Sequence, residues 1–174
     1  MAKPLPFDPI RASHQSWLDL GWSSAADGMA AVTSVMRAQQ ILQARVDEVL
    51  KPMGLTFARF ELLMLLRLSR TGKLPMSKVA VRLQVHAASV TNAADRLESA
   101  GLVERAAHPS DGRTTLITLT PAGRQLAQDS AIALNDQVFS ALGVENPRVG
   151  ELVGVLAGLR RQAGDFDADA PTFD

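Results

Sequence analysis

Two stretches of this chain carry side chains of the types that recognise nucleic acid. In residues 87–100, small and polar side chains fall on the helix face opposite an apolar stripe. They are Ala88, Ser89, Thr91 and Asn92. Hydroxyl groups hydrogen-bond to base edges, asparagine pairs well with adenine, and a small alanine lets a helix approach closely and touch a thymine methyl group. Lys78, Arg82 and Arg96 stand where the phosphates beside such a helix could be met.

A single arginine, Arg113, stands at the tip of a predicted hairpin in the second stretch, SDGRTTLITLTPAGR. A hairpin tip beside a DNA-reading helix can reach the adjacent minor groove, and arginine suits a narrow, negative groove. We expect Asp111, two residues earlier, to hold the guanidinium in place without cancelling its charge. The alternative is a solvated tip with no partner, and Thr91 and Asn92 could equally belong to ordinary surface.

Hydrophobic periodicity and capping residues predict the elements that position these side chains. Val90, Ala94 and Leu97 are spaced for the buried face of a helix. His86 stands as a weak N-cap, and Thr120 as the N-cap of the helix that Pro121 opens. Predicted helices occupy residues 10–20, 25–50, 56–68, 76–83, 87–100, 121–142 and 146–163, with a loop at 70–73 and a strand, turn and strand over 102–119.

This order predicts a mostly α fold with a small β-hairpin wing, a winged helix-turn-helix embedded in a helical dimerisation body. We expect one domain over residues 1–174, with its DNA-binding lobe at about 56–120. The dimerisation region is expected at about 10–50 and 121–163, followed by a disordered acidic tail at 164–174. The apolar stripe of residues 25–50 is too long for one domain to cover, which predicts a homodimer.

Composition excludes several classes of function. The 174 residues include no cysteine and three scattered histidines, so we expect no disulfide, no thiol sensor, no metal site and no cofactor. No apolar run of membrane-spanning length occurs, and the N-terminus lacks an apolar signal core, which favours a soluble, cytoplasmic protein. The net charge is zero, yet residues 67–124 carry nine basic and four acidic residues. A basic segment in a neutral chain suggests an anionic partner at one face.

The motifs SVTNxxDRLExxGLVER at Ser89–Arg105 and DGRxxxIxLTPxGR at Asp111–Arg124 resemble the DNA-binding half of MarR-type regulators. The resemblance extends over about residues 25–163. It implies a homodimer with a triangular helical body that represses or activates transcription at a palindromic operator on double-stranded DNA. It also implies that Ser89, Thr91 and Asn92 face the major groove and that Arg113 enters the minor groove.

The chain departs from the family pattern at several positions. Pro75 and Lys78 stand where many members have a threonine and a glutamate, so the reciprocal capping box is absent. Asn92 stands where members often have arginine, so operator preference is expected to differ. The cysteine of the thiol-sensing branch and the clustered histidines of the zinc-sensing branch are missing. Trp17 could match the tryptophan of the urate-type branch, but Glu61 and Ala93 replace its aspartate and arginine.

Many members of the family bind aromatic carboxylates between the dimerisation helices and the DNA-binding lobe, so the resemblance implies a small aromatic or anionic effector. Candidate apolar contacts are Trp17, Trp22, Phe57, Phe60 and Met64. Arg37 or Arg59 could face the carboxylate. The alternative is that these apolar residues are simply core.

Two other classes of function compete with a DNA-binding regulator. An enzyme that uses a winged helix for dimerisation needs a glycine-rich phosphate loop, a nucleophile elbow or paired carboxylates, and the sequence has none of them. A winged helix that binds only protein would have no use for the set formed by Thr91, Asn92 and Arg113. We therefore expect no enzymatic activity and favour a sequence-specific transcriptional regulator.

Overall fold

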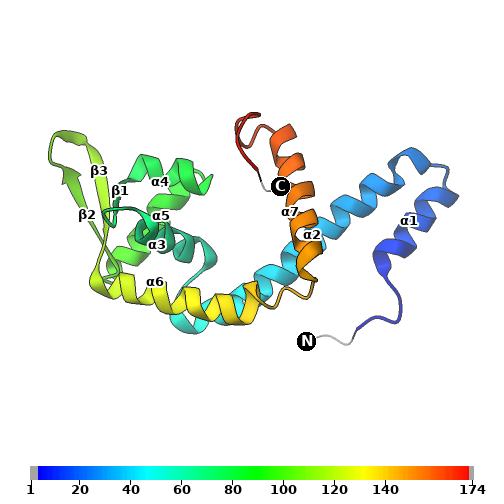
Figure 1. Ribbon diagram of the computed structural model, residues 1–174, viewed down its shortest axis with the longest axis horizontal. Coiled ribbons are helices and arrows are strands. Elements are labelled where there is room, and N and C mark those ends of the chain that lie inside the picture. Colours follow the sequence, from blue (N-terminus) through cyan, green and yellow to red (C-terminus); the bar gives the residue numbers. More distant parts are fainter. Residues whose placement is uncertain (1–3, 173–174) are drawn as a thin grey trace. The chain divides into compact units, whose positions relative to one another are not determined.

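The structure, a computed structural model that describes residues 4–172, begins with a helical hairpin (Figure 1). Helix α1 (Pro9–Asp19) is capped by Asp8, whose carboxylate accepts the amide of Ile10 at 2.9 Å. Gly21, with a φ of +81°, reverses the chain into α2 (Ser23–Leu50). Trp17 and Trp22 meet edge to face at the turn, with ring centroids 5.3 Å apart. No residue of α1 is buried, so this hairpin contributes little core of its own.

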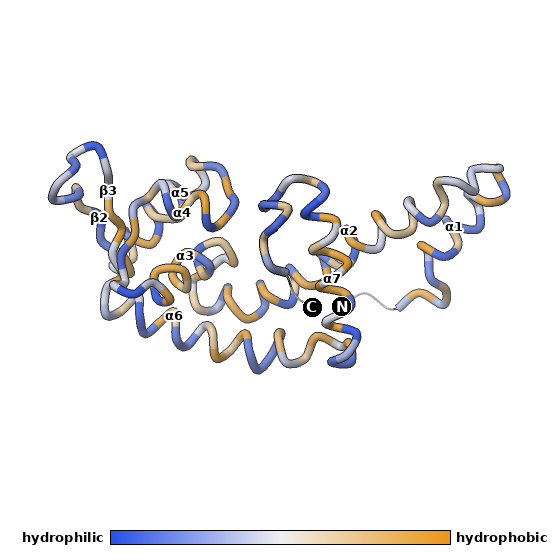
Figure 2. Tube along the Cα trace, turned by 45° about the horizontal axis from the view of Figure 1, so that its top comes forward, coloured by the Kyte–Doolittle hydropathy of each residue, from blue (hydrophilic) through white to orange (hydrophobic). Residues whose placement is uncertain are grey.

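Helix α2 is buried at Ala26 in its first turn and at Val46 and Leu50 in its last part. Val46 and Leu50 are buried there against α3 (Phe57–Leu68) and α6 (Pro121–Leu134). The 3-10 turn η1 (Lys51–Met53) and Gly54, with a φ of +71°, turn the chain from α2 towards α3. The buried residues of α3 are Phe60, Leu62, Leu63 and Leu66. Hydrophobic stretches nevertheless recur along α2 outside this core (Figure 2).

The lobe that follows is a winged helix built on α4 (Met76–Leu83) and α5 (Ala87–Ser99). Gln84 ends α4 in the left-handed region, with a φ of +53°, and allows a short turn into α5. Val90, Ala94 and Leu97 of α5 are buried, as their spacing predicts. Helix α5 packs against α3 and α4, and Val79 of α4 is buried as well.

A three-stranded antiparallel sheet in the order β1-β3-β2 completes the lobe. Strands β2 (Val103–His108) and β3 (Asp111–Leu119) form the wing that the sequence predicts. The third strand, β1 (Lys73–Pro75), lies where the sequence analysis placed the end of a loop, so that part of the prediction is wrong. Leu74 of β1 is paired with Ile117 of β3. Proline is tolerated at the end of such an edge strand because it needs to donate no ladder hydrogen bond there.

The wing is joined to α6 through Thr120 and Gly123. The Thr120 hydroxyl accepts the amide of Gly123 at 3.0 Å, which confirms the predicted N-cap, and it lies 3.0 Å from the Leu102 carbonyl. A Cβ atom added at Gly123 would lie 1.9 Å from that carbonyl oxygen. Glycine is therefore required at this position because α6 begins in direct backbone contact with the strand entry.

The described residues divide into two compact units, the first ending at Leu134 and the second beginning at Asn135. The second unit contains the π-helical turn η2 (Asn135–Phe139) and α7 (Asn146–Gln162). The predicted helix over 121–142 thus ends its regular α-helical part at Leu134. No helix in residues 4–172 is long and apolar enough to cross a membrane.

The acidic tail makes several contacts with the last turn of α7. Asp165 accepts from Arg160 Nε at 2.6 Å, and Arg161 donates to the Thr172 hydroxyl at 3.1 Å. Both guanidinium groups also lie over the Phe166 ring, at 5.2 and 5.8 Å from its centroid. These contacts join Arg160 and Arg161 to the tail, and the disorder of the tail stays a prediction; its last two residues lie outside the described part of the chain.

Candidate nucleic-acid interface

The side chains that the sequence analysis selected on α5 all lie on its exposed face. The exposed residues are Ala88, Ser89, Thr91, Asn92 and Arg96. The opposite face of the helix is buried through Val90, Ala94 and Leu97. A helix of about 10–12 Å diameter with small side chains on its outer face fits the major groove of B-DNA, which is about 12 Å wide. The local sequence therefore produces a helix that can read base edges.

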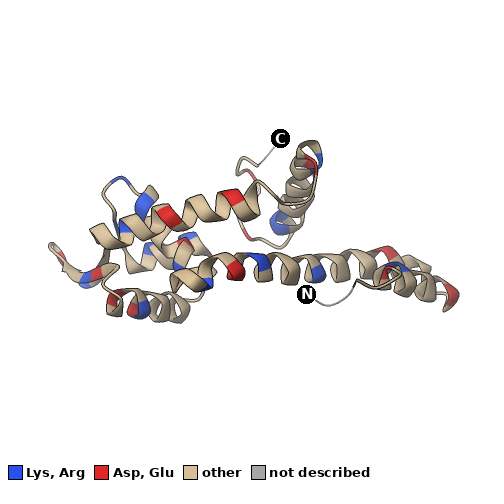
Figure 3. Ribbon diagram, turned by 90° about the horizontal axis from the view of Figure 1, so that it is seen from below, with Lys and Arg blue, Asp and Glu red and all other residues tan. Residues whose placement is uncertain are grey.

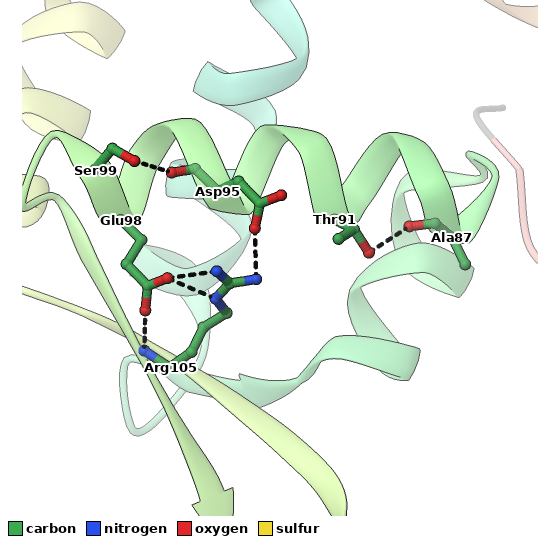
Figure 4. A network of polar contacts seen from close by, with 6 residues as sticks. All are labelled: Ala87, Thr91, Asp95, Glu98, Ser99 and Arg105. Atoms are coloured by element: carbon green, nitrogen blue, oxygen red, sulfur yellow. Dashed lines mark hydrogen bonds and ion pairs between the residues drawn. The ribbon is translucent and has the colours of Figure 1, made fainter.

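Two local hydrogen bonds define what the start of α5 can offer a partner. His86 Nδ1 accepts the amide of Ala88 at 3.2 Å, so this histidine is an N-cap, as predicted. The Thr91 hydroxyl donates to the carbonyl of Ala87 at 3.1 Å (Figure 4). Because its proton is engaged by the backbone, Thr91 presents a methyl group and the remaining oxygen lone pairs outward. It is thereby suited to accept from a base amino group or to contact a thymine methyl.

Arg105, on β2, fastens the wing to α5 through two carboxylates (Figure 4). Its Nη1 lies 2.7 Å from Asp95 Oδ1, and its Nε donates to Glu98 Oε2 at 2.9 Å. The Glu98 carboxylate also accepts the Arg105 amide at 3.1 Å. These hydrogen bonds from Arg105 hold the pKa of Glu98 below its ordinary value. The same contacts, led by Glu98, raise the pKa of Arg105.

The tip of the wing is ordered by its backbone and by short side chains. His108 Nδ1 accepts the amide of Ser110 at 3.3 Å, so this histidine stabilises the turn. The Asp111 carboxylate accepts the Thr114 hydroxyl at 2.7 Å and the Arg113 amide at 3.1 Å. These two bonds, that of Thr114 first, lower the pKa of Asp111.

Asp111 therefore shapes the turn and does not hold the Arg113 guanidinium, which corrects the prediction for this pair. The carboxylate of Asp111 is occupied by the Arg113 amide and the Thr114 hydroxyl and makes no contact with the arginine head group. Among the described residues, no hydrogen bond or ion pair engages that guanidinium. Arg113 is exposed at the tip with its full charge available.

The predicted phosphate contacts on α4 lie together on one exposed surface. Lys78 and Arg82 are one helical turn apart and border a shallow depression with Ser77 and Val81. Pro75 provides no side-chain cap at the start of α4, in agreement with the missing capping box. Basic residues recur through this lobe (Figure 3).

The candidate effector contacts are not gathered into one site within the chain. Trp17 and Trp22 lie at the first turn of the chain, whereas Phe57, Phe60 and Met64 lie beyond the opposite end of α2. A helix of 28 residues separates the two groups by about 40 Å. Phe60 is buried core and stacks on Phe57, with centroids 6.0 Å apart.

The two candidate arginines also lie in different places. Arg37 donates to Gln40 at 3.1 Å and borders an apolar depression of about 690 Å³ that the N-terminal arm covers. Arg59 lies instead beside Ser89, Asn92 and Arg96 of α5. The five aromatic or apolar candidates and the two arginines thus occupy at least three separate surfaces of one chain.

The residues that support this interface were not among the contacts predicted from the sequence. Arg105 and Glu98 were read only as parts of motifs, yet they connect the wing to α5. The available signal was their position in the chain. Glu98 stands in the last turn of α5 and Arg105 near the start of β2, and the turn at Gly101 between them brings the two side chains together. No group of histidine, cysteine or carboxylate residues in residues 4–172 could hold a metal ion.

The fold and this exposed face define a winged helix-turn-helix regulator of transcription. A model of the MarR family matches residues 55–115. The chain is similar to the MarR family transcriptional regulator Sco5413 of Streptomyces coelicolor, with 48% identity, 81% of this chain and 98% of that chain covered, and a TM-score of 0.74. The chain therefore belongs to the MarR family of DNA-binding transcriptional regulators.

Two further relatives carry informative names. The HTH-type transcriptional repressor Rv2887 of Mycobacterium tuberculosis is 35% identical over 92 residues, which cover 53% of this chain and 65% of that protein. BpsR of Bordetella bronchiseptica, whose DNA binding is described as regulated by 6-hydroxynicotinic acid, is 28% identical with a TM-score of 0.65. That likeness covers 80% of this chain and 93% of BpsR. The chain spans from 53% to 70% of the length of the curated relatives it matches.

Proposed function

We propose that this protein is a homodimeric repressor that binds a palindromic operator and is released by a small aromatic or anionic effector. The α5 helix enters the major groove, and Arg113 of the wing enters the adjacent minor groove. Because its operator lies on the chromosome, the protein acts in the cytoplasm. The repressor role is supported by the name of the mycobacterial relative.

One observation carries the DNA-binding role: an exposed polar helix face and an uncommitted arginine belong to two elements that Arg105 joins. Thr91 and Asn92 lie on α5, Arg113 lies at the wing tip, and the Arg105 contacts join the two elements. A wing free to swing would lose conformational entropy on binding, whereas a preorganised wing loses less. The arrangement therefore supports simultaneous reading of both grooves.

The dimer is supported by the uncovered stripe of α2. Val32, Val35, Met36 and Leu42 fall within about a third of the helix circumference, on the same face as the buried Val46 and Leu50. The last two are covered by α3 and α6, whereas Val32 is 65% and Met36 60% exposed. A second copy would cover the stripe and set the two recognition helices about one DNA turn, roughly 34 Å, apart.

The effector is supported by the relative that responds to a hydroxynicotinic acid, which is a small aromatic carboxylate. Its action would be a population shift, in which the ligand favours a helix spacing that the operator does not accept. To reverse a mostly competent population, it must prefer the second state by several kcal/mol. Because the candidate contacts lie apart in one chain, a site that joins the tryptophans to α3 would need both chains of the dimer.

The proposal is tested by selecting bound fragments from random genomic DNA at one fixed salt concentration. The expected result is enrichment of a palindrome whose half-sites are about 10 base pairs apart. Failure to enrich any fragment would favour a winged helix that binds only protein. Effector action is tested on the selected operator by titrating aromatic acids while tryptophan fluorescence and operator release are followed together. If no compound changes either signal below millimolar concentration, the effector part of the proposal is wrong.

A further inference from the structure

A depression beside α5 brings together two arginines to which the sequence analysis gave different roles. The start of α3 forms one wall with Thr56, Ala58 and Arg59, and one face of α5 forms the other. The α5 residues are Ser89, Asn92, Ala93 and Arg96. The depression has a volume of about 550 Å³, and no carboxylate is found among the described residues that line it. Its chemistry is therefore that of an anion site.

Neither of the two guanidinium groups is neutralised within the part of the chain that the structure describes. Arg59 donates from Nε to the Thr56 hydroxyl at 3.2 Å, which orients its head group and leaves the two terminal nitrogens uncommitted. The Arg96 guanidinium makes no hydrogen bond or ion pair in residues 4–172. Arg59 is half-buried and Arg96 is exposed, so both remain reachable from solvent. Two such cations that line one depression favour a negatively charged partner.

The position of the depression on α5 indicates which anion fits. Positions 89, 92, 93 and 96 follow the helical spacing of a single face, so the depression runs along the helix next to Asn92. On the other flank of α5, Arg105 engages Asp95 and Glu98, the two acidic residues of the helix. The flank towards α3 is thus left purely basic. A helix in the major groove has a sugar-phosphate strand along its side.

We propose that this depression binds the phosphodiester backbone that borders the major groove, with Arg59 and Arg96 as its contacts. The inference rests on the proposed operator binding and moves Arg59 from the effector site to the DNA interface. Arginine binds phosphate through charge-assisted, often bidentate hydrogen bonds, and Thr56 preorganises the Arg59 head group for this. Such contacts fix the register of the recognition helix on the duplex and carry no sequence information themselves.

The test compares Arg59→Ala with wild type on the selected operator over a range of salt concentrations. We expect binding to weaken roughly tenfold, equally on sequence variants of the operator, and the salt slope to become shallower by about two per dimer. Arg59→Lys should keep most of the slope because it keeps the charge. Arg11→Ala, which removes an exposed arginine of α1, is the matched control and should change neither quantity. Thermal melting verifies that each variant is folded.

A second measurement identifies the phosphate directly. Neutral methylphosphonates are placed one at a time along each operator strand, and one flanking position should weaken wild type but not Arg59→Ala. Wild-type affinity and salt slope in Arg59→Ala would overturn the phosphate contact while leaving operator binding intact. A second outcome would also overturn the phosphate contact. If Arg59→Ala bound the operator as tightly as wild type but no longer released it when a small anion was added, Arg59 would belong to an effector site. If wild type itself binds no duplex, the proposed function fails, and the phosphate contact fails with it.

Discussion

Arg105 Nη1 lies 2.7 Å from Asp95 Oδ1, so a wing strand and the recognition helix are joined by an ion pair at the surface of the lobe. Glu98 accepts from the same guanidinium and from the Arg105 amide. The relationship matters because it joins the third residue of β2 to α5, beyond the point where the strand begins. Arg105 thereby transmits the orientation of α5 to the strand that leads towards Arg113.

We expect Arg105→Ala to weaken operator binding several-fold while the lobe remains folded. The ion pairs lie in partly exposed surroundings, so their contribution to stability is small, whereas their effect on wing position is direct. Operator affinity and thermal melting are measured together, with Glu104→Ala, an exposed neighbour on the same strand, as the control. An Arg105→Ala protein that binds as tightly as wild type would show that the wing needs no such attachment.

The attachment of the wing should depend on pH only in acid. The pKa of Glu98 lies below its ordinary value because Arg105 hydrogen-bonds to the carboxylate. A carboxyl group with a depressed folded-state pKa stabilises the fold above its unfolded pKa and loses this contribution as the pH falls through the folded pKa. We expect an NMR titration of the Glu98 carboxyl carbon to move to a higher midpoint in Arg105→Gln. An unchanged midpoint would separate the two residues energetically.

Arg113→Ala should weaken operator binding by about 1–3 kcal/mol without unfolding the protein. The guanidinium has no partner among the described residues, so its removal costs no internal contact. If the contact is mainly one of charge, the salt slope per dimer becomes shallower by about two, one for each wing. Affinity is measured on the selected operator at several salt concentrations. Equal affinity of mutant and wild type would refute the minor-groove role.

Met36→Asp should dissociate the proposed dimer. Met36 lies in the uncovered stripe of α2, and a carboxylate there would have to be buried without a partner. Ser34→Asp, which lies on the opposite side of the same helix and is exposed, provides the matched control. Sedimentation velocity at micromolar concentration distinguishes the two species. A wild-type protein that sediments as a monomer would contradict the dimer itself.

Gly123→Ala should destabilise the fold by about 1–3 kcal/mol, because its Cβ would require backbone to move at the junction of α6 with the wing. Gly28→Ala in α2 meets no atom within 4 Å and should be neutral or stabilising by up to about 1 kcal/mol. Denaturant unfolding at one fixed protein concentration compares the two. Equal stability of both variants would mean that the Leu102 carbonyl can yield.

The sequence by itself determined the helices and the two-stranded wing of the winged-helix lobe and the exposed face of α5. These follow from local physics: Val90, Ala94 and Leu97 repeat at helical spacing, His86 and Thr120 cap the next turn, and alternation specifies the wing. Each of these signals lies within a few residues of the structure it produces. That is why Thr91, Asn92 and Arg113 could be selected without coordinates.

Tertiary structure alone decided which distant groups meet. The strand β1 has three residues and ends in a proline, so the local sequence gives no strand pattern. It forms because β3 provides an edge for hydrogen bonding. The role of Arg105 became visible only in the structure, where the start of β2 lies beside α5. Arg59 lies beside Arg96, away from Arg37 and the tryptophans, because helix packing and the length of α2 set those separations. Residue types can suggest an anion-binding arginine, but only packing decides which surface presents it.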